Sequence, residues 1–198
     1  MKKFLIIVLS ALIAFCACER KAKIQNKDIV VENTISTDKQ YMFLNYGNGY
    51  NWFESCVVYD NYLDADTTIA IAGVSNVFQV AVKMDEQSYD TKVVAIAHTK
   101  DNSGIDVKEH AFWVGDFPLN EEEVKLTFSN AFDRLMETNL PKPHSKYVVL
   151  RKELGPINAN PQYIFGNQNY QVYVDAVNGN VTEHNPVYPI DFEYSFTW

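Results

Sequence analysis

The stretch that decides the fold runs from Asn120 to Met136 and reads Asn-Glu-Glu-Glu-Val-Lys-Leu-Thr-Phe-Ser-Asn-Ala-Phe-Asp-Arg-Leu-Met. Asn120 followed by three glutamates is typical of a helix start, because a side-chain oxygen caps free backbone N–H groups and negative charge complements the helix dipole. Apolar residues then recur at intervals of three or four, at Val124, Phe128, Ala131, Phe132, Leu135 and Met136. The pattern predicts an amphipathic helix over residues 121–138. Because such a helix is marginal alone in water, we expect its apolar stripe to lie on a sheet.

Strand patterns follow once Pro141 and Pro143 have ended the helix. The candidate strands are residues 147–154, 162–165 and 170–177, and a final strand over residues 191–198 in which Phe192, Tyr194, Phe196 and Trp198 share one face. The dipeptide Asn178-Gly179 tolerates the positive φ angles of a type I′ turn, so it predicts a tight hairpin after residue 177.

The residues before the helix have the character of a β-meander. Apolar or alternating runs occur at residues 41–44, 52–59, 67–74, 77–84, 91–97 and 107–114, with turn-forming residues between them. Strands at this spacing favour antiparallel pairing between neighbours. We therefore predict an α+β fold: an antiparallel β-meander over residues 41–114, followed by one amphipathic helix packed on an antiparallel sheet over residues 115–198. The two parts either share one core or form two packed halves.

The first eighteen residues have the pattern of an export signal. Two lysines precede an apolar run over residues 4–15, which is shorter than the roughly 20 residues that cross a bilayer. The run leads into Cys16-Ala17-Cys18 and resembles a bacterial lipoprotein signal. That resemblance implies acylation of Cys18, which follows a small residue, rather than of Cys16, which follows a bulky one. A plain secretory signal and a transmembrane anchor are the alternatives.

The signal resemblance also implies a layout for the rest of the chain. Residues 1–17 are the signal peptide, residues 18–40 are a tether from the membrane, and the folded part begins near residue 41. Residues 29–31 are an alternative short first strand. The resemblance implies a lipid-anchored protein of the bacterial cell envelope, with the outer membrane as the expected site and the folded part facing the periplasm or the cell surface.

The closing hairpin carries a second resemblance. Its residues Val174, Asp175, Ala176, Asn178, Gly179 and Val181 match the signature Val-Asp-Ala-x-Thr/Asn-Gly-x-Val. Together with the helix and the strands before it, this hairpin is similar to the PepSY family over about residues 119–183. The similarity implies an envelope domain without catalytic residues, in a family often linked to peptidase inhibition or cell-surface regulation. Since the signature is structural, it transfers no functional residue.

The composition limits the class of protein. The 198 residues include 17 Lys and Arg against 25 Asp and Glu, a net charge of −8, and 47% of them are hydrophobic. This content excludes a disordered chain, and the acidic balance argues against nucleic acid, which needs a basic surface. After removal of the signal peptide, the chain would keep two cysteines, an acylated Cys18 and Cys56. We therefore expect no internal disulfide and interpret Cys56 as a buried small apolar residue.

Residues that could carry chemistry are scattered along the chain. The four histidines are His98, His110, His144 and His184. No two of them lie three or four positions apart, so they form no local zinc pair. The acidic turn with Asp60, Asp64 and Asp66 lacks the glycine and the glutamate of an EF-hand loop, and we interpret it as a solvated turn, with a looser calcium site as the alternative. We therefore expect neither a metal nor a cofactor.

Tyr46, Tyr50, Trp52 and Phe53 flank the turn over residues 47–49 and are the candidate ligand-binding residues. Aromatic rings beside such a turn can stack on a sugar or a peptide, and core packing is the alternative. Because the sequence contains no recognisable catalytic set, we predict a non-catalytic lipoprotein whose partner is an envelope protein or peptide. A glycan-binding accessory lipoprotein is the first alternative. A hydrolase whose residues meet only in the fold is the second.

Overall fold

The computed structural model describes residues 31–65, 67–84, 89–100, 104–109, 117–153, 159–167 and 169–185. Within them it contains two helices, α1 (Val31–Tyr46) and α2 (Phe128–Glu137), and eight strands. The strands are β1 (Asn51–Tyr59), β2 (Ile71–Lys83), β3 (Tyr89–Thr99), β4 (Ile105–Glu109), β5 (Tyr147–Arg151), β6 (Gln162–Gly166), β7 (Gln171–Asp175) and β8 (Val181–His184). The predicted α+β class is confirmed. Cys18, Asp66, His110 and the strand predicted over residues 191–198 lie outside the described residues.

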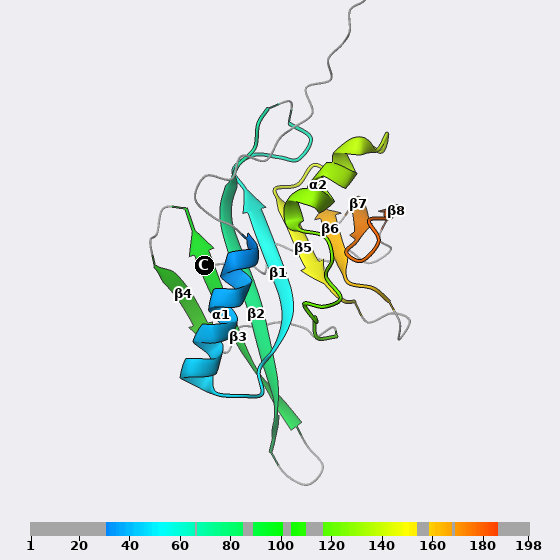
Figure 1. Cartoon of the computed structure of the whole chain (residues 1–198). Helices are drawn as coiled ribbons and strands as arrows, with labels where there is room; N and C mark the ends of the chain where they lie inside the picture. Colours follow the sequence, from blue (N-terminus) through cyan, green and yellow to red (C-terminus); the bar gives the residue numbers. More distant parts are fainter. Residues whose placement is uncertain are drawn as a thin grey trace, which may run out of the picture.

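All eight strands belong to one sheet in the order β4-β3-β2-β1-β5-β6-β7-β8, and every neighbouring pair is antiparallel. The chain builds the same plan twice, because α1 precedes the meander β1 to β4 and α2 precedes the meander β5 to β8 (Figure 1). The meanders join where β1 pairs with β5, for example at Cys56 with Val149. The first meander therefore has a helix of its own, and the prediction of a single helix was wrong.

α1 occupies residues that the sequence assigned to the tether up to residue 40 and to a strand over residues 41–44. Its buried residues are Val31, Thr34, Ile35, Asp38 and Met42. They recur at helical spacing, but two of them are polar, so no apolar stripe marks the helix in the sequence. Thr37 also bonds back into the helix, its hydroxyl donating to the carbonyl of Asn33 at 2.8 Å. Tertiary contacts rather than an amphipathic pattern hold this helix in place.

α2 begins later than the predicted start at residue 121. Its N-cap is Thr127, whose Oγ1 accepts a hydrogen bond from the N–H of Asn130 at 3.1 Å. Residues 121–123 form a turn instead, and the N–H groups of Lys125 and Leu126 both donate to the carbonyl of Ala176 rather than within a helix. The apolar stripe of the helix is confirmed, with Phe128, Ala131, Phe132, Leu135 and Met136 buried.

β2 is one continuous strand where the sequence predicted two, over residues 67–74 and 77–84. The two runs join through Ser75 and Asn76, which pair with Cys56 and Ser55 of β1. Both polar residues are fully buried. They are therefore interior residues of a long strand, and Asn76 is available to bond with whatever covers the sheet.

The sheet has two faces, here called the helix face and the second face. Both helices lie on the helix face (Figure 1), over a continuous core that includes Val74 of β2 and Phe165 of β6, one residue from each meander. The second face has two smaller apolar clusters, one of Cys56, Val149 and Ile164 and the other of Val77, Val93 and Ala95. The shared core on the helix face makes the two meanders one structural unit.

The turn between β7 and β8 is wider than the predicted two-residue type I′ turn, since β7 ends at Asp175 and β8 begins at Val181. The Asp175 carboxylate accepts hydrogen bonds from the N–H groups of Val177 and Asn178. The N–H of Gly179, where φ is 77°, donates to the carbonyl of Asp175. The aspartate, rather than the Asn-Gly pair alone, organises this loop.

Candidate functional site

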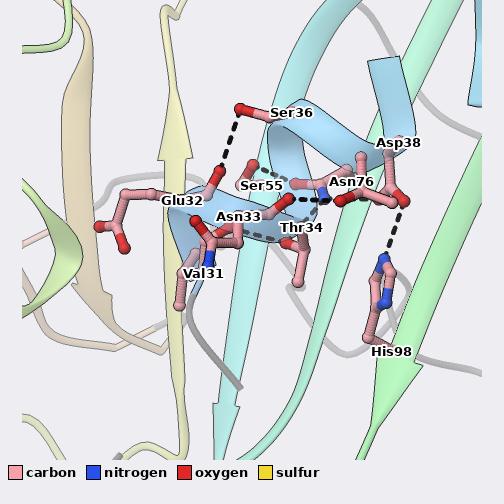
Figure 2. A network of polar contacts seen from close by, with 10 residues as sticks. Val31, Glu32, Asn33, Thr34, Ser36, Asp38, Ser55, Asn76 and His98 are labelled. Carbon is pink, nitrogen blue, oxygen red and sulfur yellow. Dashed lines mark hydrogen bonds and ion pairs between the residues drawn. The ribbon is translucent and has the colours of Figure 1, made fainter. Parts of the chain in front are cut away.

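A buried polar network joins α1 to the first meander (Figure 2). Its centre is Asn76 of β2, whose amide nitrogen donates to Asp38 Oδ2 at 2.7 Å and to Thr34 Oγ1 at 3.2 Å. Its amide oxygen accepts a hydrogen bond from the hydroxyl of Ser55 on β1. Both N–H groups and the oxygen of the amide are therefore used, which fixes the orientation of the Asn76 side chain.

The Asp38 carboxylate is the second branching point of the network. One oxygen accepts from Asn76, and the other lies 2.8 Å from Nε2 of His98 on β3. The side chain of Asp38 is 1% exposed and that of His98 is 17% exposed. A buried carboxylate is costly unless it is paired and hydrogen-bonded, and Asp38 has both kinds of partner. The carboxylate thereby connects α1 to two strands.

The partners of Ser55 give this network a structural role. The Ser55 hydroxyl, fully buried, donates to Asn76, and its oxygen accepts a hydrogen bond from Nε1 of Trp52 at 3.1 Å. A serine nucleophile needs a base within hydrogen-bond reach. In the described part of the chain, Ser55 instead has an amide and an indole as its side-chain partners. We assign the network to the positioning of α1.

An aromatic cluster lies at the C-terminal end of α1, and we call it the tyrosine end. It comprises Tyr41, Phe43, Leu44, Tyr46 and Tyr50. The ring centroids of Tyr41 and Tyr46 are 6.3 Å apart, and those of Tyr46 and Tyr50 are 5.7 Å apart in an edge-on arrangement. Phe43 and Leu44 stay 59% and 69% exposed. Large apolar side chains that stay exposed near ordered aromatic rings are a feature of surfaces that bind a partner.

Glu109 of the edge strand β4 bonds to the tyrosine end. The Tyr46 hydroxyl donates to Oε1 of Glu109 at 2.7 Å. This hydrogen bond, followed by burial and the negative charge of Glu109, raises the pKa of Tyr46 from 10.0 to about 12. Burial also raises the pKa of Tyr50, and the charge of Glu109 adds to that effect. The phenol of Tyr46 therefore remains a neutral donor at neutral pH and ties α1 to the sheet edge.

The structure brings two of the four predicted ligand-binding residues together and separates the others. Tyr46 and Tyr50 both belong to the tyrosine end and are half-buried. Phe53 is half-buried at the register shift between Trp52 and Glu54. The shift at Phe53 breaks the strict alternation of β1. The predicted platform of four rings is therefore reduced to the two tyrosines.

Trp52 is a core residue, which corrects its interpretation as a ligand-binding ring. It is 3% exposed, and its Nε1 donates to the carbonyl of Glu54 at 3.0 Å as well as to Ser55. Lys39 of α1 places its Nζ 5.0 Å from the centroid of the indole and also pairs with Glu121 at 2.5 Å. A ring buried in this way offers no face on which a ligand could stack.

An exposed histidine–carboxylate pair lies before β5. Nδ1 of His144 is 3.0 Å from Oδ2 of Asp64, and the imidazole stacks on Tyr62 with ring centroids 4.0 Å apart. Asp60 accepts a hydrogen bond from the N–H of Ala70 at 2.8 Å. The acidic turn thus serves local contacts. Across the described residues, no three His, Cys, Asp or Glu side chains gather in a way that would hold a metal ion.

Sequence reasoning missed the buried network and the exposed pair of Phe43 and Leu44. The sequence gives one indication of the network at Asn76, because an amide side chain between two apolar runs of a strand is unusual. Asp38 gives none, since its partners Asn76 and His98 lie on strands far along the chain. Phe43 and Leu44 sat in an apolar run that was interpreted as a strand, which hid their exposure.

Neither helix in the described ranges is both long and apolar enough to cross a bilayer. Comparisons of the chain with models of protein families, with curated proteins and with solved structures found no match. The function is therefore argued from the residues of the chain itself, and the tyrosine end is the surface with the strongest candidate features.

Proposed function

We propose that the chain is a lipoprotein of the bacterial cell envelope, anchored in the outer membrane through an acylated Cys18. We further propose that it binds a protein or peptide partner through the tyrosine end. The export-signal pattern of residues 1–18 supports the anchor. The observation that carries the binding proposal is the exposure of Phe43 and Leu44 beside a set of ordered tyrosines.

The chemistry of the tyrosine end suits a protein interface. Tyrosine and phenylalanine are enriched in the centres of interfaces, and tyrosine supplies a large contact area at a low cost in conformational entropy. Tyr46 is already held in place by Glu109 and by its two tyrosine neighbours. Binding a partner would therefore cost little conformational entropy at this side chain. The resemblance of residues 119–183 to the PepSY family, often linked to peptidase inhibition or cell-surface regulation, supports the same kind of function.

Glycan binding is the second candidate function. The pair of Tyr46 and Tyr50 combines aromatic rings with the carboxylate of Glu109, and aromatic faces beside hydrogen-bonding groups are what sugars bind. Because Trp52 is buried, the test of this candidate belongs at Tyr50 rather than at Trp52. A glycan array probed with the full chain and with Tyr50→Ala separates the two candidates: array binding that Tyr50→Ala abolishes would favour the glycan.

Affinity capture from envelope extracts tests the protein partner. The full chain is compared with the double variant Phe43→Ser/Leu44→Ser and with Met84→Ser, a control that removes another large apolar side chain, 65% exposed just after β2. We expect the same partner on the parent chain and on the control, with binding to the double variant weaker by about tenfold or more. A partner held equally by the double variant would overturn the assignment to the tyrosine end.

Metabolic labelling with a fatty-acid probe tests the anchor. Expressed in a bacterial host, the full chain should incorporate the probe, Cys18→Ser should not, and Cys16→Ser should behave like the parent. Labelling that depends on Cys16 alone would move the acylated residue. An unlabelled chain that is exported and cleaved would identify a plain secretory signal instead.

A further inference from the structure

The middle of the second face is buried although both described helices lie on the other face of the sheet (Figure 1). A row of register partners crosses it at right angles to the strands, from β7 to β3: Tyr173, Ile164, Val149, Cys56, Ser75 and Ala97. Ile164, Val149, Cys56 and Ser75 are 0% exposed, and Ala97 is 2% exposed. Side chains on a sheet face reach this degree of burial only when another layer lies on them. No described helix or strand supplies that layer.

The shape of the second face calls for large side chains in the missing layer. Its centre includes the small residues Cys56 on β1, Ser75 on β2 and Ala95 and Ala97 on β3, next to the buried ion pair of Glu54 and Arg151. Protein interiors are packed without voids, so a shallow floor of small side chains is matched by bulky ones from the facing layer. Aromatic rings are the side chains that best fill such a floor.

The last described strand carries a side chain on this face. His184, the last residue of β8, pairs in register with Gln171 and stacks on Tyr173 of the second face, with ring centroids 4.1 Å apart. Residues 186–198 follow. Extended, they span about 43 Å at about 3.3 Å per residue. The six strand spacings from β8 to β3 need only about 29 Å, at about 4.8 Å each.

The sequence of these last residues has the matching chemistry. Phe192, Tyr194, Phe196 and Trp198 alternate with Asp191, Glu193, Ser195 and Thr197. A period of two places all four aromatic side chains on one side of an extended segment and the polar ones on the other. We propose that residues 186–198 are the cover of the second face, with these aromatic side chains packed on the row that contains Cys56.

The accessibility of Cys56 tests the cover. In the full chain with Cys16→Ser and Cys18→Ser, Cys56 is the only thiol, and it is 0% exposed. The triple variant Tyr194→Ala/Phe196→Ala/Trp198→Ala is compared with the matched control Glu193→Ala/Ser195→Ala/Thr197→Ala. We expect maleimide labelling of Cys56 to be about tenfold faster or more in the aromatic variant, and unchanged in the control. Equal protection of Cys56 in all three chains would overturn the proposal.

A second measurement needs no change to the cover and so does not depend on whether the aromatic variant folds. In the same two-serine chain, NMR should detect contacts between the methyl groups of Val149 or Ile164 and the ring protons of Phe196 or Trp198. Methyl groups that contact other segments, or contacts that appear only between two differently labelled copies of the chain, would identify another occupant and refute the proposal. Both readouts are independent of the tyrosine end and of acylation.

Discussion

Asp38 Oδ1 and His98 Nε2 lie 2.8 Å apart, and this contact ties the first helix to a strand sixty positions later in the chain. The amide nitrogen of Asn76, on β2, donates a hydrogen bond to the other carboxylate oxygen of Asp38. The helix therefore docks through polar atoms whose partners admit one arrangement. A sliding or rotated helix would leave the buried carboxylate of Asp38 and the amide nitrogen of Asn76 without these partners, which is a large penalty.

Removing His98 should cost much more stability than removing the exposed His144. His98→Ala leaves the fully buried carboxylate of Asp38 with fewer partners, and we expect the free energy of unfolding to fall by about 2–4 kcal/mol. His144 also pairs with an aspartate, but its side chain is 66% exposed, so His144→Ala should cost about 1 kcal/mol or less. Urea denaturation measures both changes. Equal losses would mean that burial of the Asp38 pair contributes nothing.

Alkaline pH should destabilise the protein partly through Tyr46. Its pKa is about 12 in the folded protein and near 10 when unfolded, so its contribution is present below about pH 10 and is lost as the pH rises toward 12. Burial raises the pKa of Tyr59 in the same direction, so some loss remains in any variant. Tyr46→Phe should lose less stability than the parent between pH 9 and pH 11, judged by urea midpoints at each pH. A parallel decline of the two chains would contradict the assignment.

The β7–β8 loop should respond to acid through Asp175. Burial raises the pKa of this carboxyl, but hydrogen bonds from Asn160, Val177, Asn178 and Gln162 outweigh it, and the net pKa is lowered from 3.8. The resulting stability is present above about pH 4 and is lost as the pH falls through the lowered value.

At neutral pH, Asp175→Ala should therefore cost about 1 kcal/mol or more of unfolding free energy, since the loop loses its acceptor. Asp175→Asn, which keeps an oxygen acceptor, should cost less and should flatten the decline between pH 5 and pH 2. Thermal melts across this range measure both effects. An acid profile of Asp175→Asn that matches the parent would exclude the carboxylate as its cause.

Two glycines with positive φ should differ sharply in their tolerance of a side chain. Gly47 has φ of 80°, and a Cβ there would meet nothing within 4 Å, so Gly47→Ala should cost about 1–2 kcal/mol of backbone strain. At Gly166, where φ is 138°, a Cβ would lie 2.2 Å from the carbonyl oxygen of Tyr170. Gly166→Ala should therefore cost more than Gly47→Ala by about 2 kcal/mol or more in chemical denaturation. The reverse order would show that the chain relaxes at Gly166.

The elements that the sequence predicted well are those with one pattern throughout. β1 and β3 are runs rich in apolar residues with turn-forming residues near their ends, and the stripe of α2 recurs at helical spacing, so these local patterns identify them. The start of α2 was misplaced because the N–H groups of Lys125 and Leu126 donate to the carbonyl of Ala176, a partner far away in the chain. Local pattern cannot report such a contact.

α1 shows why the rest could not be predicted. The side of this helix that faces the sheet includes Thr34 and Asp38, so its sequence has the look of a solvated segment. Those side chains become interior only because Asn76, in the middle of β2, presents a matching amide. Seen alone in the sequence, Thr34 and Asp38 interrupt the apolar pattern of a helix, and Asn76 interrupts the apolar pattern of a strand. The candidate site beside it, at Phe43 and Leu44, was missed because the sequence predicted a strand over residues 41–44.

The place of β1 in the middle of the sheet sets an order of assembly. β1 is synthesised early, yet its second neighbour β5 lies far behind it, with Glu54 and Arg151 separated by 97 positions. Until β5 has been synthesised, one edge of β1 has no paired strand, and an unpaired strand edge can associate with other chains. Pairings of such long range also form slowly. The first half of the protein therefore needs protection from association with other chains until the second half has been synthesised.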